Sequence, residues 1–196
     1  MKIITLSLFF ICLQNLTFGQ NFDSIESDNT FRYYEFNHIY PGHYKDFSEV
    51  DFYNFSFQID DEVFSLKDGS YANRYDVIGF DSLSINAIYT FKNDSDTIEY
   101  AIVDLRYLTV GGSSSLDGIV ILFSIINSKL MSDYLIHYIP EQSKFVDLNK
   151  HLVLYSYKLL PDDPTCCPSK IEIGTFKIMD KSFELISLSV IDNQTK

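Results

Sequence analysis

Regular alternation of apolar and polar residues is the feature of this sequence that most constrains its fold. Between residues 53 and 59, Tyr, Phe and Ile at odd positions alternate with Asn, Ser and Gln at even positions. Residues 83–91 largely repeat the pattern. A period of two places one set of side chains on a single face of a β-strand. Both segments therefore predict strands with one buried face and one face in water.

Segments with strand character recur along most of the remaining chain. They lie at residues 97–107, 118–126, 130–139, 151–157, 170–178 and 183–191. Turn sequences separate the predicted strands along the chain, for example Lys67-Asp68-Gly69 between residues 53–59 and 83–91, and this spacing favours antiparallel meanders. Residues 118–126 are apolar at nearly every position, which predicts a central strand that is covered on both faces.

These patterns predict a mainly β fold, either an antiparallel meander sheet or a sandwich, with one or two short helices. The helices are expected at residues 141–149, with Pro140 near the start, and in the acidic, aromatic stretch 23–36. An α+β fold is the alternative. Most of the 17 Phe and 14 Tyr residues are expected in the core rather than on an exposed carbohydrate-binding face, because they alternate with polar residues.

The first 20 residues have the organisation of a secretory signal peptide. Lys2 forms a short positive region, residues 3–13 are apolar, and Thr17 and Gly19 fit the small-residue positions before a cleavage site. We therefore predict a signal peptide at residues 1–20. Residues 21–196 are expected to form a single mainly β domain, exported to the periplasm or the extracellular space.

The charge and the later apolar segments restrict the classes of partner. The chain has 15 Lys and Arg against 27 Asp and Glu, a formal net charge of −12. Nucleic acid is not expected as a partner, because binding phosphates requires clustered Lys and Arg. No transmembrane anchor is expected, since a spanning helix needs about 20 apolar residues. No lipid anchor is expected either, because Ile11 precedes Cys12 where a lipid-attachment signal needs a small residue.

Removal of the signal peptide would leave two adjacent cysteines, Cys166 and Cys167. Thiols tend to be bridged in oxidising compartments, which leaves a vicinal disulfide, an intermolecular disulfide or two reduced thiols. Successive Cα atoms are about 3.8 Å apart, closer than the roughly 4.4–6.8 Å of ordinary disulfides, so a vicinal bridge requires a turn. Pro164 and Pro168 restrict the backbone on both sides. We predict a rigid turn with a vicinal disulfide between Cys166 and Cys167. Two reduced thiols are the alternative.

The neighbours of the cysteines argue against direct chemistry. Asp162 and Asp163 precede them and disfavour a thiolate, and only Lys170 opposes these charges. No catalytic residue is therefore assigned, and Asp163 is expected to support the turn together with Pro164 and Pro168. An isolated Cys-Cys pair also lacks the spacing of a structural zinc site, and no metal or other cofactor is assigned.

Residues 163–169, Asp-Pro-Thr-Cys-Cys-Pro-Ser, resemble the Asp-Pro-x-Cys-Cys-Pro signature of LppP/LprE-type bacterial lipoproteins. Asp94, Asp96 and the Gly-Gly-Ser at 111–113 resemble an Asp-rich loop and a turn of the same proteins. The resemblance implies a bacterial secreted protein, and no biochemical activity is established for these relatives. Their lipid anchor does not carry over because of Ile11. A calcium loop does not carry over either, because only two of its acidic positions remain.

These features predict an exported binding or structural domain in which the cysteine turn supports the fold. An enzyme is not favoured, because the sequence has no nucleophile elbow, His-Glu-x-x-His motif, phosphate loop or dinucleotide loop. The alternative is a thiol redox or metal-handling protein that uses Cys166 and Cys167 directly. The sequence does not identify the partner; a protein and a component of the cell envelope are the two candidates.

Overall fold

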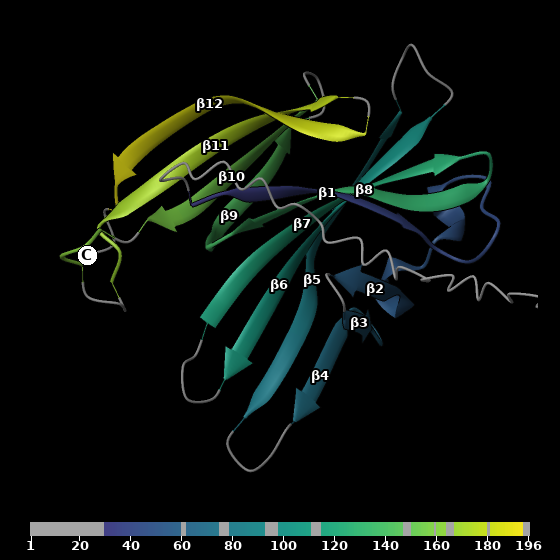
Figure 1. Cartoon of the computed structure of the whole chain (residues 1–196), viewed down its shortest axis with the longest axis horizontal. Coiled ribbons are helices and arrows are strands. Elements are labelled where there is room, and N and C mark those ends of the chain that lie inside the picture. Colours follow the sequence, from purple (N-terminus) through teal and green to yellow (C-terminus); the bar gives the residue numbers. More distant parts are fainter. Residues whose placement is uncertain are drawn as a thin grey trace, which may run out of the picture.

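The computed structural model describes residues 30–59, 62–74, 79–92, 98–110, 115–146, 150–158, 160–163, 167–179 and 181–193. Within these ranges the chain forms antiparallel sheets of six, four and two strands (Figure 1), which confirms the predicted mainly β fold. The helical elements of the described part are two 3₁₀ turns, η1 (Phe47–Glu49) and η2 (Phe52–Asn54). The predicted signal peptide lies outside the described residues, so export stays a prediction.

The six-stranded sheet is an antiparallel meander with one returning strand, in the order β1-β8-β7-β6-β5-β4. Its strands are β1 (Arg32–Ile39), β4 (Ser70–Arg74), β5 (Phe80–Lys92), β6 (Glu99–Val110), β7 (Ser115–Ile126) and β8 (Lys129–Tyr138). Strands β4 to β8 pair in sequence order, and β1 pairs with β8. The predicted turn at residues 67–69 precedes β4, and its Gly69 has a φ of 81° that favours glycine.

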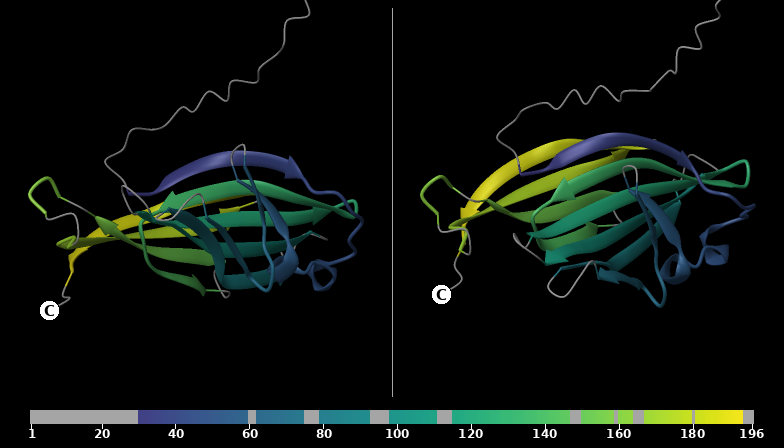
Figure 2. Two further views of the ribbon diagram at one scale, coloured as in Figure 1. Left: turned by 90° about the horizontal axis from the view of Figure 1, so that it is seen from below. Right: turned by 60° about the horizontal axis from the view of Figure 1, so that its bottom comes forward.

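The four-stranded sheet is a second meander, in the order β12-β11-β10-β9. Its strands are β9 (Pro140–Val146), β10 (His151–Lys158), β11 (Lys170–Met179) and β12 (Ser182–Asp192). A buried cluster joins the two sheets, since Val120 and Ile136 of the larger sheet belong to the same cluster as Leu152, Leu154 and Phe176 of the smaller one. Figure 2 shows the smaller sheet, in light green and yellow, beside the teal strands of the larger sheet.

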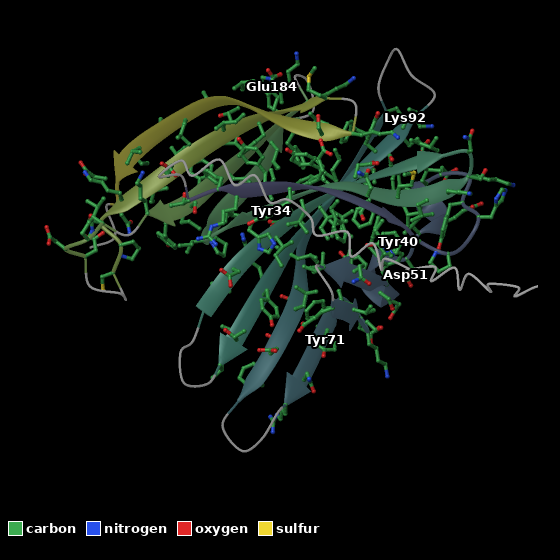
Figure 3. All side chains as sticks on the ribbon, viewed as in Figure 1. Tyr34, Tyr40, Asp51, Tyr71, Lys92 and Glu184 are labelled. Atoms are coloured by element: carbon green, nitrogen blue, oxygen red, sulfur yellow. The ribbon has the colours of Figure 1, made fainter. Side chains whose placement is uncertain are left out.

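The opposite face of the six-stranded sheet is covered by η1, η2 and the hairpin of β2 (Ser56–Ile59) and β3 (Glu62–Ser65). The ring of Phe123 in β7 lies 5.2 Å from that of Phe52, 5.7 Å from that of Tyr40 and 6.0 Å from that of Phe57, centroid to centroid. Figure 3 labels Tyr40 beside this layer. The aromatic residues at this position fill the core, as their alternation predicts.

Strand β7 is covered on both faces, which confirms the prediction for residues 118–126. Ile121 and Phe123 belong to the cluster under the β2–β3 hairpin, and Val120 and Leu122 belong to the cluster shared with the smaller sheet. All four side chains are fully buried. Each such burial stabilises the fold by about 1.5–3 kcal/mol, so this strand anchors both layers.

The predicted helices are wrong wherever the structure describes them. Residues 141–146 belong to β9 and residues 32–36 belong to β1, while residues 23–29 and 147–149 lie outside the described part. Strand β9 pairs with β10, and the helix propensities of residues other than Gly and Pro differ by at most about 0.7 kcal/mol per residue, so sheet pairing decides the conformation. Pairing with β8 does the same for β1. The strand predicted from residue 53 begins only at Ser56, because η2 precedes it.

Candidate functional site at the cysteine turn

The segment predicted as a cysteine turn lies between β10 and β11, and the structure describes part of it. Cys167 and Pro168 are described, and Cys167 is exposed. Pro164 and Cys166 lie outside the described residues. The vicinal disulfide therefore stays a prediction, as does the role of Pro164.

Asp163 makes hydrogen bonds to residues on both sides of the cysteine pair. Its Oδ2 atom accepts from the backbone N–H of Leu160 at 2.9 Å, from the backbone N–H of Ser169 at 2.9 Å and from the Ser169 hydroxyl at 3.0 Å. The backbone N–H of Asp163 donates in turn to the Leu160 carbonyl at 3.0 Å. One carboxylate oxygen thus connects the residue that precedes the turn to the residue that follows the cysteines.

The same hydrogen bonds keep Asp163 charged. The backbone N–H of Leu160 and then that of Ser169 lower the pKa of Asp163, with smaller contributions from the Ser169 hydroxyl and the charge of Lys170. A carboxylate at this point adds negative charge to the segment that carries the cysteines, and negative charge disfavours a thiolate.

The end of β12 holds the other side of the turn. The backbone N–H of Asn193 donates to the Ser169 carbonyl at 2.8 Å, and the Asn193 side-chain amide donates to the Pro168 carbonyl at 2.9 Å. Next to them, Lys170 and Asp192 form an ion pair, and the hydrogen bond and charge of Lys170 lower the pKa of Asp192. The turn is therefore connected to the last residues of β12.

A second polar cluster, not among the predicted site residues, lies on the six-stranded sheet; we call its four residues, Asn86, Asp104, Arg106 and Tyr138, the Asp104 cluster. The Tyr138 hydroxyl donates to Oδ1 of Asp104 at 3.0 Å, and Arg106 donates to the Tyr138 hydroxyl at 2.5 Å. Asn86 donates to Oδ2 of Asp104 at 2.6 Å. Asp104 is fully buried, and burial followed by the charge of Asp104 raises the pKa of Tyr138. Tyr138 therefore stays protonated and available as a donor.

The Asp104 cluster neutralises a buried charge. The Arg106 guanidinium lies 3.7 Å from Oδ2 of Asp104 and 5.3 Å from the centre of the Tyr138 ring. Asp104 and Arg106 are two residues apart on β6 and therefore share one face. This spacing of opposite charges is visible in the sequence. Asn86 is the extra residue of a β-bulge between Ile85 and Ala87, and this position has no sequence signal. Because these side chains bind one another, we interpret the cluster as a structural network that holds neighbouring strands together.

Glu172 of β11 is a second buried carboxylate with bound donors. Its Oε2 accepts from the backbone N–H of Thr30 at 2.8 Å and from the Thr30 hydroxyl at 2.7 Å, and its Oε1 accepts from Lys158 at 3.0 Å. Burial raises the pKa of Glu172, but the hydrogen bonds of Thr30 and Lys158 together outweigh burial and hold the pKa below its ordinary value. Glu172 thereby ties Thr30, two residues before the start of β1, to the smaller sheet.

Asp133 of β8 is a buried carboxylate in a different environment. It is the extra residue of a bulge, because Leu122 pairs with Tyr134 and Phe123 pairs with Ser132. Within the described residues, neither oxygen of Asp133 has a hydrogen bond of ordinary geometry. Burial raises the pKa of Asp133, and the Ser124 hydroxyl and the charge of Lys181 offset only part of this increase.

The part of the chain that the structure describes has neither a metal-binding cluster nor a membrane-spanning helix. There, no group of three or more His, Cys, Asp and Glu side chains is arranged to hold a metal ion. The same residues include no helix with the length and apolar character needed to span a bilayer. Asp94 and Asp96 lie outside the described residues.

No family model matches the chain, and neither the curated proteins nor the solved structures that were searched include a match. The resemblance to LppP/LprE-type lipoproteins therefore stays a prediction that rests on the short cysteine motif.

Proposed function

We propose that this chain is an exported β domain with a binding or structural role, in which the cysteine turn braces the end of β12. The observation that carries the proposal is the Asp163 carboxylate, which binds Leu160 before the turn and Ser169 after it. Asn193 then connects Ser169 to the end of β12. A turn held at both ends supports a strand that exposes apolar side chains, and such surfaces are typical of interaction sites.

The signal-like sequence of residues 1–20 supports export. The test is expression of the full chain in a bacterium, followed by mass spectrometry of the protein recovered from the periplasm and the medium. A mature protein that begins after Gly19 or Gln20 is expected. A full-length protein confined to the cytoplasm would contradict export and remove the oxidising environment on which the disulfide depends.

The state of the two cysteines is tested on the same exported protein. Intact mass is expected to lie two hydrogens below that of the reduced protein, without a dimer linked by disulfide, and alkylation before reduction is expected to modify neither cysteine. Alkylation of both Cys166 and Cys167 would show two reduced thiols and contradict the vicinal bridge.

Replacement of both cysteines separates a brace from direct thiol chemistry. The Cys166→Ser, Cys167→Ser variant is expected to lose stability modestly, by about 1 kcal/mol, because the closed loop is very short. Neither the wild-type protein nor the variant is expected to accelerate dithiothreitol-driven reduction of insulin or to bind zinc. Ser169→Thr keeps both thiols and a hydroxyl at the turn, and serves as the control.

A thiol redox or metal-handling protein is the second candidate. The observation that favours it is the position of Cys167 in an exposed part of the turn. If the wild-type protein accelerates insulin reduction or binds zinc, and the still-folded double variant does neither, this candidate replaces the brace.

A further inference from the structure

We propose that β12 pairs antiparallel with β12 of a second copy of this chain, so that two four-stranded sheets join into one. This inference rests on the binding role proposed above and names the partner. Strand β12 ends its sheet in the order β12-β11-β10-β9, so on its outer side it has no strand neighbour among the described residues. Figures 1 and 2 show it, in yellow, at the margin of the molecule. The N–H and C=O groups of such an edge are a template for another strand.

The other edges of the two large sheets carry features that discourage pairing. Strand β1 has Arg32 and Glu35 and a register shift between Glu35 and His38. Strand β4 has only five residues and ends at Arg74. Strand β9 begins with Pro140, and the charged Glu141 follows this proline. Short strands, charges, bulges and proline all protect edges. The bulge of β12 itself lies at Ile186, outside residues 187–191.

Strand β12 lacks charge over its central part. Residues 185–191 read Leu-Ile-Ser-Leu-Ser-Val-Ile and contain neither a charged residue nor a proline. Ile186, Leu188, Val190 and Ile191 are 45%, 39%, 48% and 46% exposed. Leu188 and Val190 lie on one face of this edge strand and Ile191 lies on the other, because Leu188 and Val190 pair with Gly174 and Glu172 of β11 and Ile191 pairs with Ile171. These half-exposed apolar side chains gain free energy when a further strand covers them.

The bulge in β12 sets the register of the second copy. The pairing with β11 shifts between Thr175 and Phe176 and leaves Ile186 as the extra residue, so the regular part of the edge starts at Ser187. A two-fold axis through Ser189 pairs Leu188 with Val190 of the second copy, and Val190 with Leu188. In each copy, Leu188 pairs with Gly174 of β11 and Val190 pairs with Glu172. The side chains of Leu188 and Val190 from both copies therefore lie on the same face of the joined sheet. Apolar cross-strand pairs stabilise a sheet by roughly 0.2–1 kcal/mol each.

The charged ends of β12 fit this register. Asp192 falls opposite the bulged Ile186 rather than opposite another acid, and it is already bound to Lys170. Glu184, labelled in Figure 3, lies beyond the paired residues and opposite Lys177 of its own β11. No acid of one copy therefore faces an acid of the other across the strand pair.

Self-association by one strand is expected to be weak and sensitive to salt. Five residue pairs bury less than the roughly 800 Å² per partner of a standard interface, so a dissociation constant on the order of micromolar or above is expected. Each copy carries a formal net charge of −12, and this repulsion is screened when salt is added. The dimer is therefore expected to tighten as the salt concentration rises.

The test is sedimentation velocity of the mature protein over a range of concentrations, at low and high salt. Wild-type protein is expected to show a monomer–dimer equilibrium, and Val190→Lys is expected to remain monomeric. Val63→Lys is the matched control, because Val63 is also an exposed strand residue, 59% exposed on β3. It receives the same charge and is expected to dimerise as the wild type does. Circular dichroism checks that both variants fold.

A second measurement locates the contact. Hydrogen exchange of residues 187–191 is expected to slow as the wild-type concentration increases, and to stay constant in Val190→Lys. A wild-type protein that is monomeric at all concentrations overturns the self-pairing, and so does equal dimerisation of wild type and Val190→Lys. Either result leaves the cysteine-turn experiments standing, because those measure the state of the cysteines and the stability of the turn rather than association.

Discussion

The ring of Tyr138 on β8 lies directly over Gly118 on β7. A Cβ atom at Gly118 would lie 2.3 Å from Cε1 and 2.6 Å from Cζ of the ring. Gly118 pairs with Tyr138 on one side and with Arg106 of β6 on the other. The ring therefore crosses β7 where there is no side chain, and its hydroxyl reaches Asp104 two strands away. Gly118 serves this contact by its small size rather than by its backbone angles.

Gly118→Ala is expected to destabilise the protein by about 1–3 kcal/mol, the usual cost of overpacking a core. The measurement is the free energy of unfolding in urea. In a Tyr138→Leu background the same substitution is expected to cost much less, because the ring that the methyl group meets is absent. An equal cost in both backgrounds would show that the contact is not the cause.

Tyr138→Phe removes one hydroxyl while retaining the ring over Gly118. The buried Asp104 loses a donor and Arg106 loses an acceptor, so we expect a loss of about 1–3 kcal/mol in the free energy of unfolding. Tyr134→Phe on the same strand is the control, since the structure gives its hydroxyl no hydrogen bond within the described residues. The two variants are compared by urea denaturation, and similar losses would argue against the Asp104 cluster.

Asp133 is expected to make the protein less stable as the pH rises. Its pKa is raised in the folded protein above an unfolded value of about 3.9. The folded state therefore binds the proton more tightly, and the stability that this proton provides is present at low pH and lost as the pH rises through the folded pKa. Asp133→Asn removes this titration, so its stability relative to the wild type should increase between about pH 4 and pH 7.

Glu172 provides a comparison of opposite sign. Its lowered pKa means that its contribution is present above the unfolded value of about 4.3 and is lost as the pH falls through the folded pKa. Glu172→Gln should therefore lose stability relative to the wild type more at pH 7 than at pH 3. Urea denaturation across this range measures both slopes, and parallel slopes for the two variants would contradict the two environments.

Asp163→Ala is expected to loosen the cysteine turn without unfolding the sheets. Loss of the carboxylate removes the acceptor for the N–H groups of Leu160 and Ser169, so both amides should exchange with solvent several-fold faster. Hydrogen exchange read by mass spectrometry detects this change. Asp162→Ala removes the neighbouring acid and is expected to leave exchange at both amides unchanged. Slow exchange at Ser169 in Asp163→Ala would rule out this brace.

The cysteine turn shows how far sequence reasoning reaches at the candidate site. The prolines and the acid were visible as a motif around Cys166 and Cys167. The contact of Asn193 with Pro168 and Ser169 was not, because it depends on where β12 ends after pairing with β11. The Asp104 cluster was hidden for the same reason, since its four residues come from three different strands.

The sequence by itself determined the strands whose side chains alternate and the central place of β7, because period and hydrophobicity are local properties that decide which face enters a core. Only the tertiary structure decided that residues 141–146 extend as β9, that Asn86 and Asp133 occupy bulges, and that Gly118 makes room for Tyr138. Each of these depends on pairing or packing between segments distant in the chain, and their energies exceed the weak local preferences that a sequence displays.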